Sequence, residues 1–130
     1  AHRDSRYVGI DCYTQSKPRA AELLANARTN LRRFGRKARL HVATSQKILG
    51  PARRRTVFDI AYIDGDHSGL GAALDLCLAW PLVKPAGIGA FDDWTHPRFK
   101  GLRRTVGPLL GELSHDVLVS NEQLWVRKVA

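Results

Sequence analysis

The stretch Val57-Phe-Asp-Ile-Ala-Tyr-Ile-Asp-Gly-Asp-His-Ser68 decides the fold of this chain. Its first part, residues 57–63, is apolar and rich in β-branched and aromatic side chains, which predicts a buried strand. Residues 87–91, Gly-Ile-Gly-Ala-Phe, repeat this pattern and run into a pair of aspartates. Residues 70–83 lie between the two runs and carry apolar side chains at helical spacing. Strand, helix and strand together predict a right-handed crossover in a parallel sheet.

Polar side chains follow both predicted strands at the point where each strand ends. In α/β sheets with parallel strands, ligands bind at the carboxyl ends of the strands. Two neighbouring strands would therefore bring four carboxylates and one imidazole to the edge of the sheet where a site is expected. These residues are Asp64, Asp66, His67, Asp92 and Asp93.

The remaining segments extend this unit to an α/β fold with a mostly parallel sheet and an antiparallel C-terminal hairpin. Ser16 could cap the first helix, Gly35 would end it, and Pro108 would kink or split the last helix. Residues 84–87 form a turn before the second buried strand, and only residues 121–122 separate the two strands of the hairpin. Further strands are expected at 6–11, 38–43, 115–120 and 123–129, helices at 20–34 and 99–113, and a short turn or helix at 44–49.

Length and composition indicate one soluble globular domain. The chain has 130 residues, of which 44% are hydrophobic, enough to build a core. No apolar run approaches the roughly 20 residues that span a bilayer, and the polar N-terminus does not resemble a secretory signal. Cys12 and Cys77 lie in apolar surroundings without metal-type spacing, so we expect two buried thiols and a cytoplasmic protein.

The charge of the chain is strongly positive. Lysine and arginine number 21 against 12 acidic residues, which gives a net charge of +9. The excess is concentrated at residues 28–39 and 53–55, with more at 98–104. Nucleic-acid binding is one interpretation, but aromatic residues do not alternate with these arginines and no nucleic-acid-binding motif is present. A solvated basic face is therefore favoured, and an anionic substrate or nucleic acid stays the alternative.

Asp64, Asp92 and Asp93 have the chemistry of a cation site. Three carboxylates in one cleft repel each other, which raises their pKa values unless a cation balances them. Mg²⁺ prefers oxygen ligands and keeps several waters, so two or three carboxylates and substrate oxygens would complete its shell. The alternative is that one or two of these acids cap the helices that follow.

Other side chains near these acids have two interpretations each. His67 could act as a general base, because the free pKa of histidine lies near neutrality, or it could be a structural residue bonded to Asp66. His96 is a weaker candidate for the base. Trp94 follows the acidic pair and could wall a substrate pocket, whereas Trp80 ends a helix and is expected to pack in the core.

At these residues the chain resembles the class I S-adenosylmethionine-dependent methyltransferases, a family with a Rossmann-like fold. It is most similar to the small-molecule O-methyltransferases, whose fourth and fifth strands end in I-D-G-D-H-S and F-D-D-[WY]. Residues 58–68 and 91–94 carry these two motifs, and residues 80–87 join them. Residues 7–11, Tyr-Val-Gly-Ile-Asp, resemble the second strand, and residues 100–106 resemble the helix after the fifth strand.

The resemblance implies S-adenosylmethionine as cofactor. Asp11 would hold its ribose hydroxyls, Ser45 would lie near its adenine, and Asp64 would also belong to the cofactor site. An acid at the end of a strand can accept two hydrogen bonds from a ribose diol, although Asp11 could equally cap a turn.

The resemblance also implies a divalent cation, with Mg²⁺ expected, and a small-molecule hydroxyl as methyl acceptor. Asp64, Asp92 and Asp93 would bind the cation, and His67 would be the base. The substrate hydroxyl would attack the methyl group in line, and the cation would chelate that hydroxyl and lower its pKa.

One departure from the family pattern concerns the first strand. That strand and its glycine-rich loop should precede Tyr7, where only six residues stand and no Gly-x-Gly pattern occurs. We therefore expect residues 1–130 to be a single, partial methyltransferase domain that lacks the first strand, so cofactor binding by this chain alone is an open question. An incomplete sheet would expose strand edges and favour pairing with another chain, as in a homo-oligomer.

Two alternatives to the methyltransferase hypothesis stay open from the sequence. The first is a metal-dependent hydrolase on the same scaffold, in which the acids and His67 would activate water. The second is a basic, non-enzymatic nucleic-acid-binding module, whose affinity would fall steeply with salt.

Overall fold

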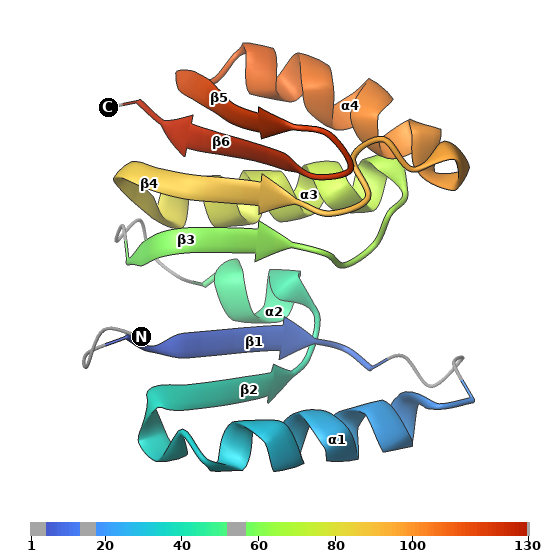
Figure 1. The fold of residues 1–130 in the computed structure, drawn as a ribbon, viewed down its shortest axis with the longest axis vertical. Helices are drawn as coiled ribbons and strands as arrows, with labels where there is room; N and C mark the ends of the chain where they lie inside the picture. The colour runs from blue at the N-terminus through green and yellow to red at the C-terminus, as the bar shows by residue number, and fades with distance from the viewer. Residues whose placement is uncertain (1–4, 14–17, 52–56, 130) are drawn as a thin grey trace. The chain divides into compact units, whose positions relative to one another are not determined.

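The predicted strand–helix–strand unit is present in the computed structural model, which describes residues 5–13, 18–51 and 57–129. Strands β3 (Phe58–Ile63) and β4 (Val83–Phe91) pair in parallel, with Ile63 opposite Phe91. Helix α3 (Gly69–Ala79) and the short 3₁₀ helix η2 (Trp80–Leu82) connect them (Figure 1). The crossover that the sequence indicates is therefore confirmed.

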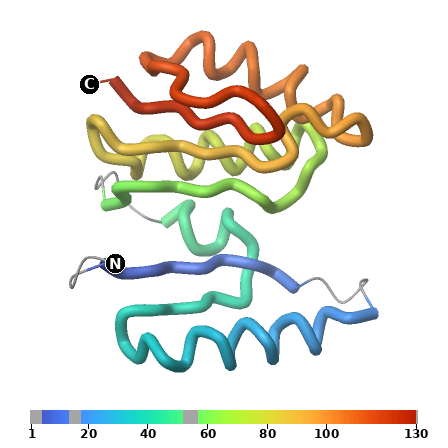
Figure 2. Tube along the Cα trace, in the orientation of Figure 1, coloured from blue at the N-terminus to red at the C-terminus, as the bar shows by residue number. Residues whose placement is uncertain are grey.

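The chain divides into two compact units, residues 1–51 and 52–130. In the second unit, four strands form a sheet in the order β3-β4-β6-β5. Strands β5 (His115–Ser120) and β6 (Leu124–Lys128) form the predicted antiparallel hairpin. Strand β6 also pairs antiparallel with β4, with Leu124 opposite Phe91, so the turn of the hairpin lies beside the carboxyl end of β4 (Figures 1 and 2).

Two helices complete the core of the second unit. Helix α3 and helix α4 (Lys100–Gly111), which follows the 3₁₀ helix η3 (Pro97–Phe99), contribute the apolar side chains that face the sheet. Phe91 and Val126 from the sheet are fully buried against them. The core cluster consists of Ala72, Leu76, Trp80, Phe91, Trp94, Leu102, Val106, Leu110, Leu124 and Val126.

The first unit is smaller, and its helices contain no buried residue among those that the structure describes. Strands β1 (Tyr7–Asp11) and β2 (Ala38–Val42) pair in parallel, with Asp11 opposite Val42. Helix α1 (Ala20–Arg32) and the 3₁₀ helix η1 (Gly35–Lys37) connect them, and helix α2 (Ser45–Leu49) follows. Helix α1 ends at Arg32, two residues before the predicted end, and Gly35, with a positive φ of 53°, begins η1. The Ser16 cap lies outside the described residues.

One prediction about local structure was wrong, and another was wrong in part. Residues 84–87 are not a turn before the strand but an irregularity inside β4, where the pairing with β3 shifts and Ala86 takes a φ of 62°. Helix α4 is not split at Pro108, which leaves a kink as the remaining part of that prediction; Pro108 lies on the exposed face near the end of the helix, where the carbonyl that loses its partner can be hydrated.

The expected burial of the two thiols was also wrong. Cys12 and Cys77 are free and exposed. Cys12 lies just after the end of β1. Cys77 lies off the inner face of α3, because the buried positions of that helix are 72, 73, 76 and 79.

Strand edges are left unpaired in both units. Within the described residues, β1 pairs with β2 alone and β3 pairs with β4 alone. Ile60 and Tyr62 on β3 are 54% and 48% exposed. None of the helices in the described part of the chain combines the length and apolarity needed to cross a bilayer.

The burial pattern of α3 predicts very different losses of stability when two leucines on this helix are replaced by alanine. Leu76 is 1% exposed and belongs to the core cluster, whereas Leu70 is 80% exposed. We expect Leu76→Ala to lower the free energy of unfolding by about 2–5 kcal/mol, because it removes buried methyl groups and leaves a cavity. Leu70→Ala should stay within about 0.5 kcal/mol.

Tryptophan fluorescence during urea denaturation measures this difference in the second unit. All three tryptophans, at positions 80, 94 and 125, lie in that unit. Equal losses for the two variants would contradict the assignment of the inner face of α3.

Candidate active site

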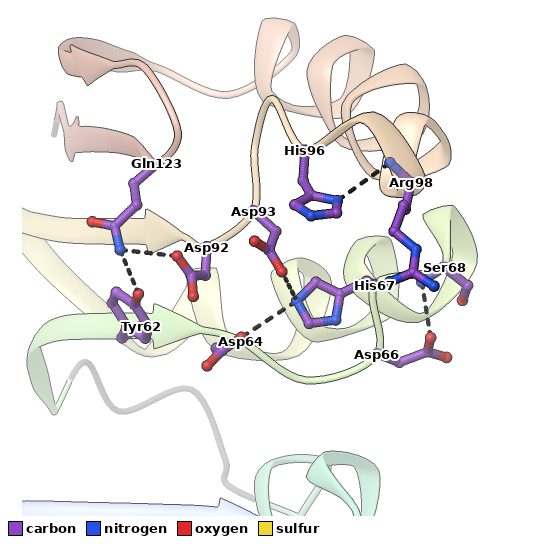
Figure 3. A network of polar contacts seen from close by, with 10 residues as sticks. All are labelled: Tyr62, Asp64, Asp66, His67, Ser68, Asp92, Asp93, His96, Arg98 and Gln123. Carbon is purple, nitrogen blue, oxygen red and sulfur yellow. Dashed lines mark hydrogen bonds and ion pairs between the residues drawn. The ribbon is translucent and has the colours of Figure 1, made fainter.

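The ends of β3 and β4 bring the predicted acids together. Asp64 directly follows β3, and Asp92 and Asp93 directly follow β4. The parallel register continues past both strands, because the backbone N–H of Asp92 donates to the carbonyl of Ile63 at 3.1 Å. Figure 3 shows the side chains of the three acids at the same edge of the sheet, with Asp64 and Asp93 at the imidazole of His67 and Asp92 beside Gln123. The sequence prediction for these residues is confirmed in position.

His67 lies between two of the acids. Its Nε2 atom is 3.3 Å from Oδ1 of Asp64 and 3.1 Å from Oδ2 of Asp93 (Figure 3). The atom is buried, yet neither carboxylate is aligned with it for a hydrogen bond. The ring stacks on Phe99 with 4.4 Å between the ring centroids. Nε2 is thus a buried nitrogen that faces two carboxylates and has no hydrogen-bond partner among the described residues.

The alternative in which His67 is a structural residue bonded to Asp66 is wrong. Asp66 is used in the turn, where its Oδ1 accepts from the backbone N–H of Ser68 at 2.8 Å. Ser68 then caps α3, because its Oγ accepts from the backbone N–H of Gly71 at 3.1 Å. The cap of α3 is therefore a serine, which leaves Asp64 available for other contacts.

Asp92 is held by a residue that sequence reasoning missed. Nε2 of Gln123 donates to Oδ1 of Asp92 at 2.9 Å and to the hydroxyl of Tyr62 at 2.7 Å (Figure 3). The hydrogen bond from Gln123 is the main cause that lowers the pKa of the Asp92 carboxyl. Burial and the neighbouring Asp92 raise the pKa of Tyr62 to about 12, so its hydroxyl stays neutral.

Asp64 is shifted in the opposite direction. Burial raises the pKa of its carboxyl, and the negative charge of Asp92 raises it further. Two carboxyl groups at the ends of adjacent strands thus differ in the direction of their pKa shifts. Such a separation is typical of functional sites, where acids in different environments take different roles.

The acids of this site carry more negative charge than their partners balance. Among the residues that the structure describes, Asp64 and Asp93 face the imidazole of His67, and the lysine and arginine pairs lie elsewhere, at Lys84–Asp59 and Arg127–Asp116. A hard cation suits this donor set. No group of three or more acidic, histidine or cysteine side chains in the described ranges is arranged to hold a metal by itself. A cation here would therefore depend on water and substrate oxygens for much of its shell.

Three further residues discussed from the sequence, two tryptophans and one histidine, have structural roles. Trp94 is only 7% exposed and packs in the core near Phe91, which favours a packing role over the wall of a substrate pocket. Trp80 is also 7% exposed and packs in the core, as expected. His96 caps η3, because its Nδ1 accepts from the backbone N–H of Arg98 at 3.2 Å.

The remaining predicted residues, Asp11 and Ser45, belong to the first unit. Asp11 ends β1, and its Oδ1 accepts from the backbone N–H of Tyr13 at 2.7 Å. One of its oxygens therefore stabilises the turn, as the alternative interpretation required. Ser45 is the first residue of α2, and only Ala43 and Thr44 separate it from the end of β2.

A methyltransferase-domain family matches residues 1–94 of the chain. This match covers most of the sequence, and the chain belongs to that family. A search of curated proteins returned no significant match. The resemblance inferred from the two acidic motifs is thus confirmed at the level of the family.

Solved structures with the same fold include several O-methyltransferases. The O-methyltransferase NovP has a TM-score of 0.69 and 14% identity, and the match covers 99% of this chain and 62% of that one. TomG from Streptomyces achromogenes, in complex with S-adenosylmethionine, has a TM-score of 0.62 and 16% identity, with 96% and 73% covered. MycE from the mycinamycin pathway, with Mg, S-adenosylhomocysteine and mycinamycin VI, has a TM-score of 0.61 and 19% identity, with 98% and 45% covered.

These similarities establish the fold and show how much of each matched protein the chain covers. The methyltransferase fold class, with an antiparallel C-terminal strand pair, is confirmed. The chain spans about three fifths of the length of the first solved structures that it matches, at 61%, 62% and 58%.

The opposite pKa directions of Asp64 and Asp59 predict opposite effects on stability. The folded protein raises the pKa of Asp64 by burial, so ionised Asp64 destabilises the fold above its folded pKa and the penalty vanishes as the pH falls below the unfolded value. Hydrogen bonding to Lys84 lowers the pKa of Asp59, so this group stabilises the fold at neutral pH and its contribution is lost on acidification. We therefore expect Asp64→Asn to raise the free energy of unfolding at pH 7 and Asp59→Asn to lower it.

Urea denaturation at pH 7 and at pH 3 measures the free energy of unfolding of both variants, and a chelator keeps divalent cations from the acids. Both differences from the unsubstituted chain should shrink at pH 3. Destabilisation by Asp64→Asn at pH 7 would contradict the assigned environment of Asp64.

Proposed function

We propose that the protein carrying this chain is an S-adenosylmethionine-dependent methyltransferase that methylates a hydroxyl group of a small molecule with the help of a divalent cation. The observation that carries the proposal is the convergence of Asp64, Asp92, Asp93 and His67 at the carboxyl ends of β3 and β4, in a chain of the methyltransferase-domain family. O-Methyltransferases of this fold, among them NovP, support the reaction type.

The cation would be Mg²⁺, held by Asp64, Asp92 and Asp93. Three carboxylates at one sheet edge, without a lysine or arginine partner among the described residues, have the charge that such an ion neutralises. No three of these side chains form a closed ligand set in the described ranges, so one or two of the acids at a time would hold the ion, with waters and substrate oxygens completing its shell. MycE, a structure of the same fold, contains Mg and S-adenosylhomocysteine.

The cofactor would contact Asp11, Ser45 and Asp64. Asp11 has one oxygen bonded to the backbone N–H of Tyr13, and its carboxylate lies at the end of a parallel strand, where ribose hydroxyls are bound in dinucleotide folds. S-Adenosylmethionine, when bound, supplies the methyl group that is transferred. TomG supports this choice of cofactor, because it was crystallised with S-adenosylmethionine.

The chain's own residues would hold the acceptor and take its proton. Asp64 and Asp93 lie 3.3 Å and 3.1 Å from Nε2 of His67, and Phe99 stacks against the ring. Nε2 is buried and faces two carboxylates, so one of these carboxylates would have to turn away before His67 could accept the proton of the substrate hydroxyl as that oxygen attacks the methyl group. Fixed orientation of the acceptor and the base contributes to the rate without further chemistry from the protein.

We also propose the extent of the domain, its pairing with another chain, the class of acceptor and the compartment. Residues 1–130 would be one partial catalytic domain, and the unpaired edges of β1 and β3 would favour pairing with another chain, including a second copy. A small-molecule acceptor is supported by the MycE complex with mycinamycin VI, and sugar hydroxyls, phenols and polyketide alcohols all suit the site. The free thiols of Cys12 and Cys77 support a reducing compartment such as the cytoplasm.

The comparisons favour neither alternative function. A hydrolase would use the same acids without the methyl donor, and a nucleic-acid-binding module would use the basic residues instead of the acids. The family match and the O-methyltransferase structures support the methyl-transfer reaction over both.

Transfer of a labelled methyl group from S-adenosylmethionine to a panel of sugars, phenols and polyketide alcohols tests the proposal. We expect product that depends on Mg²⁺, and we expect Asp93→Ala to reduce its rate on the order of a hundredfold, because the variant removes charge that acts in the transition state. Asp116→Ala is the matched control, because Asp116 pairs with Arg127 on the hairpin and should leave the rate unchanged.

Full activity of Asp93→Ala, or no product with any acceptor, would contradict the proposed function. Metal-dependent hydrolysis of phosphate or ester compounds without the methyl donor would favour the hydrolase instead.

A further inference from the structure

The side-chain amide of Gln123 makes three hydrogen bonds at the edge of the site. Its Nε2 atom donates to Oδ1 of Asp92 at 2.9 Å and to the hydroxyl of Tyr62 at 2.7 Å. Its Oε1 atom accepts from Nε1 of Trp125 at 3.0 Å. Tyr62 and Trp125 also contact each other edge to face, with 6.4 Å between ring centroids. The amide is therefore engaged on both sides by residues of the sheet.

The chemistry of the partners fixes the orientation of this amide. An indole N–H can only donate, so the atom that faces Trp125 must be the amide oxygen. An ionised carboxylate can only accept, so the atom that faces Asp92 must be the amide nitrogen. Rotation of the amide by 180° would break both bonds, so Gln123 presents a donor to Asp92 in one orientation.

The backbone brings Gln123 to this place through the pairing of β6 with β4. Leu124 lies opposite Phe91 in the antiparallel register, so the residue before Leu124 lies beside the residue after Phe91. The backbone N–H of Trp94 also donates to the carbonyl of Glu122 at 2.7 Å. The hairpin turn is thus attached to the loop after β4 by one backbone bond and one side-chain bond.

We infer that Gln123 is a positioning residue that holds the carboxylate of Asp92 in the orientation needed to bind the cation. The inference rests on the proposed function, because it assigns Gln123 a role toward the proposed cation site. Hydrogen bonds to ligating carboxylates orient them, and loss of such a bond typically costs 10- to 100-fold in metal affinity. The hairpin, which carries no acidic motif of the family, thereby becomes part of the site.

Binding of Mn²⁺, followed by the electron paramagnetic resonance signal of the free ion, tests this role in the full chain. We expect Gln123→Met, which keeps the length of the side chain and removes its polar atoms, to weaken Mn²⁺ binding by about tenfold or more. Gln123→Asn keeps the amide but is one methylene shorter, and it should show a similar loss. Gln46→Met is the matched control, because Gln46 lies on α2 in the first unit and should leave Mn²⁺ binding unchanged.

A double-mutant cycle with Asp92→Asn separates positioning from a general effect on the fold. If Gln123 acts through Asp92, Gln123→Met should not weaken Mn²⁺ binding further when Asp92 is already asparagine. A variant that merely loosens the hairpin would weaken binding by the same factor in both backgrounds. Tryptophan fluorescence confirms that each variant is folded, and Gln123→Asn decides the outcome if Gln123→Met is not.

The outcomes separate this inference from the proposed function. Mn²⁺ binding by the unsubstituted chain, with equal affinity for both Gln123 variants or with additive losses in the cycle, would overturn the inference alone. Absence of Mn²⁺ binding by the unsubstituted chain would overturn the proposed cation site and the inference together.

Discussion

The parallel pairing of β3 with β4 is the constraint on which the rest of the second unit depends. Because Ile63 lies opposite Phe91, the residues that follow the two strands meet at one edge of the sheet. The hydrogen bond from the backbone N–H of Asp92 to the carbonyl of Ile63 extends that register by one step into the site. Phe91, which is fully buried, fixes the end of β4 in the core directly before Asp92. The core and the acid cluster are therefore positioned by the same pair of strands.

Two carboxylates on this edge affect stability in opposite directions, because the pKa of Asp64 is raised and that of Asp92 is lowered. Burial raises the pKa of Asp64, which means that its ionised form is unfavourable in the folded protein. His67 faces Asp64 and Asp93, and Gln123 donates to Asp92. Proteins commonly retain such unfavourable groups where function needs them.

The sequence predicts the parts of this structure that depend on local pattern. The alternation and apolar runs of β3 and of the C-terminal hairpin, and the acids after β3 and β4, are visible in the chain because each is set by residues close in sequence. The role of Gln123 could not be predicted, because it depends on which strand the hairpin pairs with, and no local pattern specifies pairing between distant strands. The antiparallel pairing of β6 with β4 is the information that places Gln123 beside Asp92. The irregularity in β4 and the exposure of Cys77 were missed for a similar reason, since both depend on tertiary packing.

The central claim is that the acids after β3 and β4 form a cation site, and anomalous X-ray diffraction from crystals of the chain grown with Mn²⁺ and S-adenosylhomocysteine tests it most directly. The account predicts an anomalous peak bounded by the carboxylates at the ends of β3 and β4, with Asp64 and Asp93 among its ligands. Crystals that hold Mn²⁺ elsewhere, or none at saturating concentration while Nε2 of His67 still lies between the two carboxylates, would contradict it.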